Sequence, residues 1–211
     1  MPSMNLYLIR HGETAYNRDG LGLGRADIPL TPFGERQAGA LGRRLAGVPF
    51  ERVFVSPLRR AQQTAAAVAG ERLPLETLDD LTEMHVGETE GLTFAAMRER
   101  FPEFLREWSG DDAASLPMPG GESLDDVAVR VIRALDTVRA SGATSVAVVA
   151  HNFVLRVALC HILGLPPARF RVFGSDLASV SHLVFRAGHT GIRMINDRCH
   201  LGDIGAPGDG R

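Results

Sequence analysis

The chain has 211 residues, with 23 Lys and Arg residues against 25 Asp and Glu residues, and its net charge is −2. All of the cationic residues are arginines, which excludes mechanisms that need a Schiff-base lysine, a lysine general base or a P-loop lysine. The balanced charge argues against a nucleic-acid partner, and no apolar run reaches the roughly 18 residues of a membrane span. We therefore expect neither a nucleic-acid nor a membrane partner.

Two cysteines, Cys160 and Cys199, are too few for a disulfide framework and lack metal-ligand spacing. Residues 1–10 do not show the basic and apolar regions of a signal peptide. These features predict a cytoplasmic protein with reduced thiols. Residues 1–201 are expected to form a single domain, and the glycine-rich residues 202–211 are expected to form a flexible tail.

The first half of the chain alternates apolar runs with helical patterns. Residues 6–9 and 52–55 predict buried strands, since central parallel strands are covered on both faces. Between them, Thr31 followed by Pro32 predicts a helix start, and that helix should run to Gly47. Another helix is expected to start near Pro57.

The second half of the chain continues the alternation. Ser123 and Asp126 form a predicted capping box at the start of a helix that Gly142 should end. Residues 146–150 predict the clearest strand, followed by a helix. Residues 181–185 and 192–195 predict two later strands, with Gly188 and Gly191 marking the turn between them. The pattern predicts an α/β fold, a three-layer α/β/α sandwich with a mainly parallel central sheet.

Reactive side chains follow three of the predicted strands. Arg10 and His11 end the first, Arg60 follows the second, and His151 ends the third. Because ligands of open α/β sheets bind at the carboxyl ends of the strands, we expect these residues to converge on one anion site. A neutral imidazole can serve as the nucleophile in phosphoryl transfer, while guanidinium groups hold the phosphoryl oxygens. Such a site needs no metal, but it needs a carboxyl group with a raised pKa to protonate the leaving group.

Several segments resemble the motifs of the histidine phosphatase superfamily, which includes cofactor-dependent phosphoglycerate mutases and small phosphatases. Residues 8–14 read LIRHGET, with Asn17 close behind, residues 24–31 read GRADIPLT, residues 56–65 read SPLRRAQQTA, residues 81–91 read LTEMHVGETEG, and residues 148–151 read VVAH. These motifs occur in the family's order, and the resemblance covers nearly the whole chain.

The resemblance implies a phosphatase of the small phosphatase branch that works through phosphohistidine. It implies that His11 is the nucleophile and Glu83 the proton donor. It also implies that Arg10, Arg60 and His151 hold the phosphoryl group. Asn17 is implied as a further polar contact, whereas Arg59 lies one position off the motif arginine and is expected to be solvated.

Three positions depart from the family pattern, namely Leu23, Thr89 and Asn152, and we expect them to reshape the part of the pocket that meets the organic half of the substrate. Asn152 is therefore included among the predicted substrate-binding residues. His85 is a further candidate contact, since residues 83 and 85 would share one face of a strand. A polar residue at the rim is an equally good interpretation of His85.

Residues 84–122 are expected to form a small cap insertion. Apolar residues between Phe94 and Trp108 fall at helical spacing, interrupted by Pro102. The favoured interpretation is a face packed on the main domain, and the functional one is a cap that selects the leaving group.

The predicted function is metal-independent hydrolysis of a phosphomonoester of a small metabolite, with no cofactor. A phosphoglycerate mutase is the alternative within the family, and its members are usually longer. A non-enzymatic phosphate-binding module and a metallohydrolase stay open as other classes. The expected partner is a small phosphorylated substrate, and a homodimer is left open.

Overall fold

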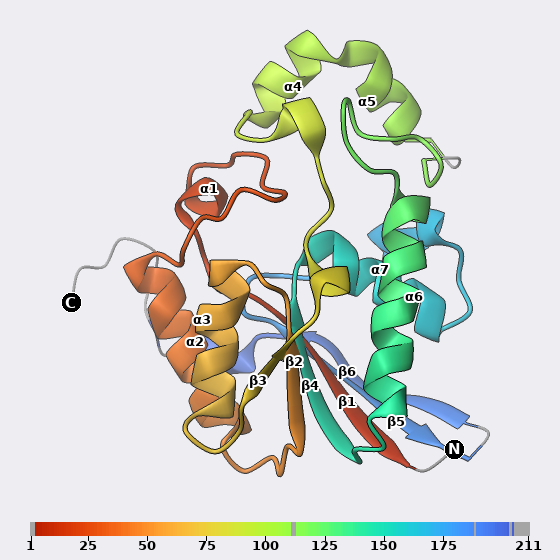
Figure 1. Ribbon diagram of the computed structural model, residues 1–211. Helices are drawn as coiled ribbons and strands as arrows, with labels where there is room; N and C mark the ends of the chain where they lie inside the picture. The colour runs from red at the N-terminus through yellow and green to blue at the C-terminus, as the bar shows by residue number, and fades with distance from the viewer. Residues whose placement is uncertain (1–2, 111–112, 188, 203, 205–211) are drawn as a thin grey trace.

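The computed structural model describes residues 3–110, 113–187, 189–202 and 204, and the strands of this part form one sheet in the order β3-β2-β4-β1-β5-β6 (Figure 1). The strands are β1 (Met4–Arg10), β2 (Arg52–Val55), β3 (Leu75–Thr77), β4 (Ser145–Ala150), β5 (Val180–Arg186) and β6 (His189–Asp197). β1 to β4 run parallel, whereas β5 pairs antiparallel with both β1 and β6. The predicted mainly parallel sheet is confirmed.

Two pairs of helices cover the two faces of the sheet (Figure 1). The α-helices are α1 (Ala15–Arg18), α2 (Pro32–Leu45), α3 (Arg59–Ala69), α4 (Phe94–Arg100), α5 (Pro102–Trp108), α6 (Leu124–Ala140) and α7 (Asn152–Ile162). α2 and α3 pack on one face with Ile9, Val53 and Val149, and α6 and α7 pack on the other with Leu8 and Phe54, among others. Because successive strand residues point to opposite faces, the apolar runs of the sequence fill both cores. The predicted three-layer sandwich is confirmed.

The helix boundaries follow the capping residues of the sequence. The Thr31 hydroxyl accepts a hydrogen bond from the backbone N–H of Gly34 at 3.0 Å, at the start of α2. At the start of α6, Ser123 Oγ accepts from the backbone of Asp126 at 3.1 Å, and Asp126 Oδ2 accepts from the backbone of Ser123 at 2.9 Å. Both predicted helix starts are confirmed.

Three details differ from the sequence-based expectations. Gly191 lies inside β6 and not in the turn, because β6 begins at His189, which pairs with Arg186 of β5. Gly188 and most of the predicted tail of residues 202–211 lie outside the described residues. Residues 83–86 belong to no strand or helix, so the expected strand carrying Glu83 and His85 is wrong. β3 is an additional edge strand.

α4 and α5 stand away from the sheet, beyond the carboxyl ends of the parallel strands (Figure 1). Neither helix contains a fully buried residue, and Phe94 is 64% exposed. Phe104 and Trp108 of α5 pack against the core on the α6 and α7 side. The expected packing on the main domain is therefore right for α5 and wrong for Phe94. No helix of the described segments has the length and hydropathy that crossing a membrane would demand.

Candidate active site

The carboxyl ends of β1, β2 and β4 bring the two motif histidines together. The backbone N–H of His11 donates to Ala150 O on β4 at 3.1 Å, and the N–H of Ser56 donates to Val149 O, also at 3.1 Å. The rings of His11 and His151 lie 5.1 Å apart between centroids and are tilted by 55°. The predicted convergence of these strand ends is confirmed.

His11 has one ring nitrogen free for chemistry. Its Nδ1 lies 2.7 Å from the carbonyl oxygen of Gly12, which only accepts, so Nδ1 carries the proton and Nε2 keeps the lone pair. Burial, followed by the charges of Arg60 and Arg10, lowers the pKa of His11 well below 6.5. The ring is therefore neutral at physiological pH, as a nucleophile must be.

His151 is held in the opposite tautomer. Its Nδ1 accepts a hydrogen bond from Arg60 Nε at 3.2 Å, and its Nε2 lies 2.7 Å from Ser56 Oγ. An Nδ1 that accepts leaves the proton on Nε2, so His151 donates to Ser56. Burial and the charge of Arg60 lower the pKa of His151 well below 6.5, and this ring is also neutral.

The two motif arginines are anchored by backbone carbonyls. Arg60 is 0% exposed, and its Nη1 and Nη2 donate to Ala26 O at 2.8 Å and Gly24 O at 2.7 Å. Arg10 Nη1 donates to Ser175 O, and burial lowers the pKa of Arg10 to about 10, so it stays charged near neutral pH. The site thus contains two fixed positive charges beside two neutral imidazoles.

Glu83 places a buried carboxyl group beside Arg10 and His11. Its side chain is buried, and its carboxyl oxygens accept from the backbone N–H groups of Met84 at 2.8 Å and Phe153 at 3.3 Å. Burial raises the pKa of Glu83, while the Met84 N–H and the arginines act in the opposite direction. A carboxyl group with a raised pKa can hold a proton for transfer.

Three of these groups, Arg10, His11 and Glu83, line a cavity of about 190 Å³. Its lining residues come from the end of β1, the α1 loop, the segment before α4 and the start of α7: Arg10, His11, Asn17, Leu21, Leu23, Glu83, Asn152 and Phe153. Asn17 Oδ1 accepts from the backbone and the hydroxyl of Thr14 at 3.1 and 2.9 Å, so its oxygen holds the α1 turn. Leu23 and Asn152, two of the three departures from the family pattern, face this cavity.

Other singled-out residues lie elsewhere. The residues that line the cavity do not include Arg60, His151, His85 or Thr89. His85 is partly buried, and its backbone N–H donates to Glu122 Oε2 at 2.8 Å. Thr89 is buried and donates to Val86 O at 2.7 Å. Arg59 is exposed, as expected.

Sequence reasoning did not single out Phe153 or the aromatic cluster behind it. The Phe153 ring lies 6.4 Å from Trp108 of α5 and 5.8 Å from Phe170, between centroids. Through Phe153, the cap helix α5 therefore contacts the wall of the cavity. The position of Phe153, two residues after His151, was the available signal.

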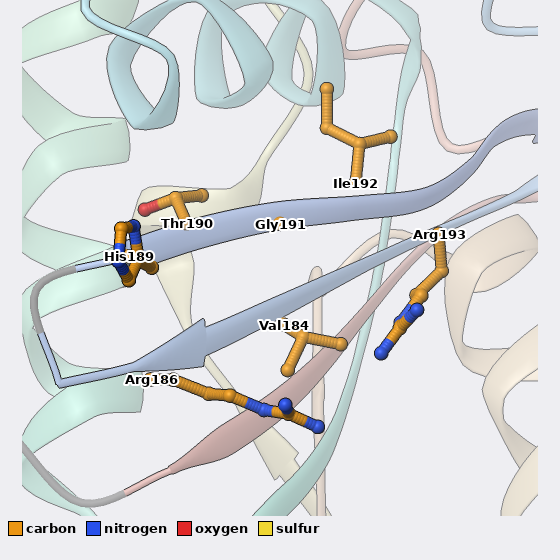
Figure 2. A pocket seen from close by; sticks show the side chains of 7 residues that line it. All are labelled: Val184, Arg186, His189, Thr190, Gly191, Ile192 and Arg193. Atoms are coloured by element: carbon orange, nitrogen blue, oxygen red, sulfur yellow. The ribbon is translucent and has the colours of Figure 1, made fainter.

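A second cavity, of about 400 Å³, lies on the β5–β6 hairpin (Figure 2). Figure 2 shows its lining side chains on the two strands: Val184, Arg186, His189, Thr190, Gly191, Ile192 and Arg193. Phe185, beside this cavity, pairs with Met4 at the start of β1, whereas His11 follows the end of β1. The cavity therefore lies near the opposite end of the strands from His11. It shares no lining residue with the cavity beside His11. In the described ranges, no cluster of three or more His, Cys, Asp or Glu side chains is placed to hold a metal ion.

A family model described as the histidine phosphatase superfamily (branch 1) matches residues 6–198. The chain belongs to this superfamily. Among its relatives, phosphoserine phosphatase 1 of Hydrogenobacter thermophilus is 32% identical over 204 residues, which are 95% of this chain and 96% of the relative. The adenosylcobalamin/alpha-ribazole phosphatase of Escherichia coli is 33% identical over 197 residues, 92% of this chain and 97% of the relative.

Solved histidine phosphatase structures share the fold. A putative alpha-ribazole-5'-P phosphatase from Escherichia coli matches with a TM-score of 0.86 and 32% identity, covering 93% of this chain and 98% of its own. A mycobacterial glucosyl-3-phosphoglycerate phosphatase matches with a TM-score of 0.84 and 28% identity, covering 93% and 100%. Family membership and these relatives identify the chain as a phosphatase.

Proposed function

We propose that this histidine phosphatase hydrolyses a phosphomonoester of a small metabolite through a phosphohistidine formed on His11, without a metal ion. The observation that carries the proposal is the cavity that brings together neutral His11, cationic Arg10 and the buried carboxyl group of Glu83. A nucleophile, a phosphoryl-binding cation and a proton donor are the three groups that the reaction needs.

In the first step, His11 Nε2 attacks phosphorus, the P–O bond to the organic group breaks, and the leaving oxygen takes the proton of Glu83. In the second step, Glu83 accepts a proton from water, whose oxygen attacks the phosphohistidine. The N–P bond then breaks, and inorganic phosphate leaves. The first step leaves His11 phosphorylated and Glu83 deprotonated, and the second step restores both groups, so the cycle consumes one ester and one water.

Arg10, Arg60 and His151 are proposed to hold the phosphoryl oxygens, as the family motifs imply. The support is their placement: Arg10 lines the cavity, and the His151 ring lies 5.1 Å from that of His11. Asn17 and Asn152 line the same cavity and are proposed as polar contacts of the substrate. The role of His85 stays a prediction.

The organisation of the chain is proposed as a single catalytic domain of residues 1–201, with a cap insertion at residues 84–122. The contact between Trp108 of the cap and Phe153 supports a part for the cap in substrate choice. The substrate class is proposed from relatives that are named for phosphoserine, alpha-ribazole phosphate and glucosyl-3-phosphoglycerate. Two free cysteines support the cytoplasm as the compartment, and the homodimer stays a prediction.

The test is release of phosphate from p-nitrophenyl phosphate with excess EDTA present. We expect turnover in EDTA, and loss of turnover in His11→Ala, because this variant has no nucleophile. Activity that EDTA abolishes, or a near-normal rate in His11→Ala, would contradict the mechanism. Phosphatase names among the relatives favour hydrolysis over the mutase alternative, and 3-phosphoglycerate with the bisphosphate primer should yield more phosphate than isomer.

A further inference from the structure

Three of the four buried side-chain polar atoms that have no partner in the described segments lie at or beside the catalytic cavity; the fourth is Nδ1 of His200, which does not line the cavity. Within the described segments, Arg10 Nε, Asn152 Oδ1 and Arg156 Nε are buried and have no hydrogen-bond partner. Such atoms are rare in proteins, because an unmade hydrogen bond is costly away from water. Arg10 belongs to the phosphoryl end of the site. Asn152 and Arg156 have no part in the proposed chemical steps, so their free atoms point to recognition of the rest of the substrate.

Arg156 lies on the face of α7 that borders the cavity. Residues three and four positions apart are neighbours on a helix, so Arg156 lies next to Asn152 and Phe153, both of which line the cavity. The guanidinium carbon of Arg156 is 5.9 Å from the centre of the Phe170 ring, and that ring is 5.8 Å from the Phe153 ring. Arg156 therefore lies beside Phe170, on the side of the cavity that Asn152 and Phe153 line.

The second observation is that Arg156 lacks an ion-pair partner within 4.0 Å in the part of the chain that the structure describes. The nearby carboxylate of Asp176 is engaged by Arg198 and Asn196, each at 3.0 Å. Burial lowers the pKa of Arg156, and the charges of Asp176 and Glu83 act in the opposite direction. A partly buried, unpaired guanidinium is costly to the fold, which indicates a ligand that pairs with it.

We propose that Arg156 binds a carboxylate on the organic half of the substrate and so selects phosphomonoesters of small carboxylic acids. A guanidinium matches one carboxylate in charge and, through its planar fork, in geometry. The inference rests on the proposed hydrolysis at His11, since it assigns the leaving group of that reaction. Arg156 is a specificity residue here and takes no part in bond making or breaking.

The experiment compares two esters that differ only in a carboxylate, O-phosphoserine and O-phosphoethanolamine. For each, kcat/KM is measured directly, and inhibition of p-nitrophenyl phosphate hydrolysis reports binding even for an ester that turns over slowly. We expect the wild type to prefer phosphoserine about tenfold to a hundredfold in kcat/KM or in the inhibition constant, the effect of one charged hydrogen-bonded pair. No preference in the wild type would overturn the inference without any variant being made.

In Arg156→Gln, the preference should fall to near unity, while p-nitrophenyl phosphate and phosphoethanolamine keep their wild-type rates. Arg156→Lys should keep part of the preference, because it keeps the charge without the fork. Arg169→Gln removes an exposed arginine from the segment after α7 and should keep the whole preference. A preference that survives in Arg156→Gln, or an equal loss on all three esters, would overturn the inference. Failure of the wild type on p-nitrophenyl phosphate would instead refute the proposed hydrolysis.

Discussion

Replacing Glu83 by Gln tests the proposed proton donor with little change in shape. In the native site, the two carboxyl oxygens accept from Met84 N at 2.8 Å and from Phe153 N at 3.3 Å. The Gln oxygen can keep the shorter bond, but the Gln NH₂ group cannot accept from Phe153. The variant therefore loses the longer hydrogen bond together with the transferable proton.

The two losses have different magnitudes and different dependence on the leaving group. The lost hydrogen bond costs about 1 kcal/mol, and it affects every substrate alike. Proton donation contributes about 10²- to 10⁴-fold, roughly 3 to 5.5 kcal/mol, but only where the leaving oxygen is strongly basic. p-Nitrophenolate leaves without a proton. An alkyl ester should thus slow about 10²- to 10⁴-fold more than p-nitrophenyl phosphate.

Steady-state kcat/KM of Glu83→Gln is measured on p-nitrophenyl phosphate and on a simple alkyl phosphate, each relative to the wild type. Thermal unfolding of the variant serves as the control for an intact fold. Equal losses on the two esters would show that Glu83 acts through charge or packing, and the assignment of the proton donor would be refuted.

Two further predictions concern stability. Burial raises the pKa of Glu83 above its ordinary 4.5, so the stability that its protonated form contributes is complete below pH 4.5 and is lost as pH rises through the raised value. In urea unfolding, the free energy of unfolding of Glu83→Gln should therefore increase relative to that of the wild type as pH rises. A difference that stays constant with pH would contradict this. In α2, a Cβ at Gly34 would lie 2.1 Å from Glu13 O, so Gly34→Ala should lower the free energy of unfolding by about 3 kcal/mol or more. Gly39→Ala, on the same helix, is the control: its Cβ would meet only Arg43 at 3.6 Å, so the free energy of unfolding should rise by about 0.5 to 1 kcal/mol. Similar effects of the two substitutions would refute the close approach of Gly34 to Glu13.

The central strands and the helix starts could be predicted because local chemistry determines them. Buried runs such as residues 146–150 and the Ser123 capping box contain their own signals. β3 could not be predicted in this way, because two half-buried residues and one exposed residue at the edge of a sheet show no periodicity. Gly191 was misplaced because glycine suits a turn as well as an exposed edge strand such as β6.

The histidines and arginines of the site could be identified from strand ends, but the tautomer and hydrogen-bond partners of each histidine could not. The tautomer of His11 follows from a contact with its neighbour Gly12, but that of His151 depends on Ser56 and Arg60, which are distant in sequence and meet it only in the fold. Arg156 looked like one arginine among many, because its lack of a partner is a property of tertiary packing. Spacing along a chain carries no information of that kind.

The position of β1 in the sheet has a consequence for folding while the chain is being synthesised. The strand that leads to His11 lies between β4 and β5, and its residue Asn5 meets Thr144 and His182, which lie 139 and 177 residues further along the chain. At the usual pace of a bacterial or eukaryotic ribosome, about 5 to 20 residues per second, β1 waits on the order of ten to thirty seconds for both neighbours. During that time the apolar residues of β1 lack the strands that cover them, so the emerging chain exposes the kind of apolar surface that chaperones bind.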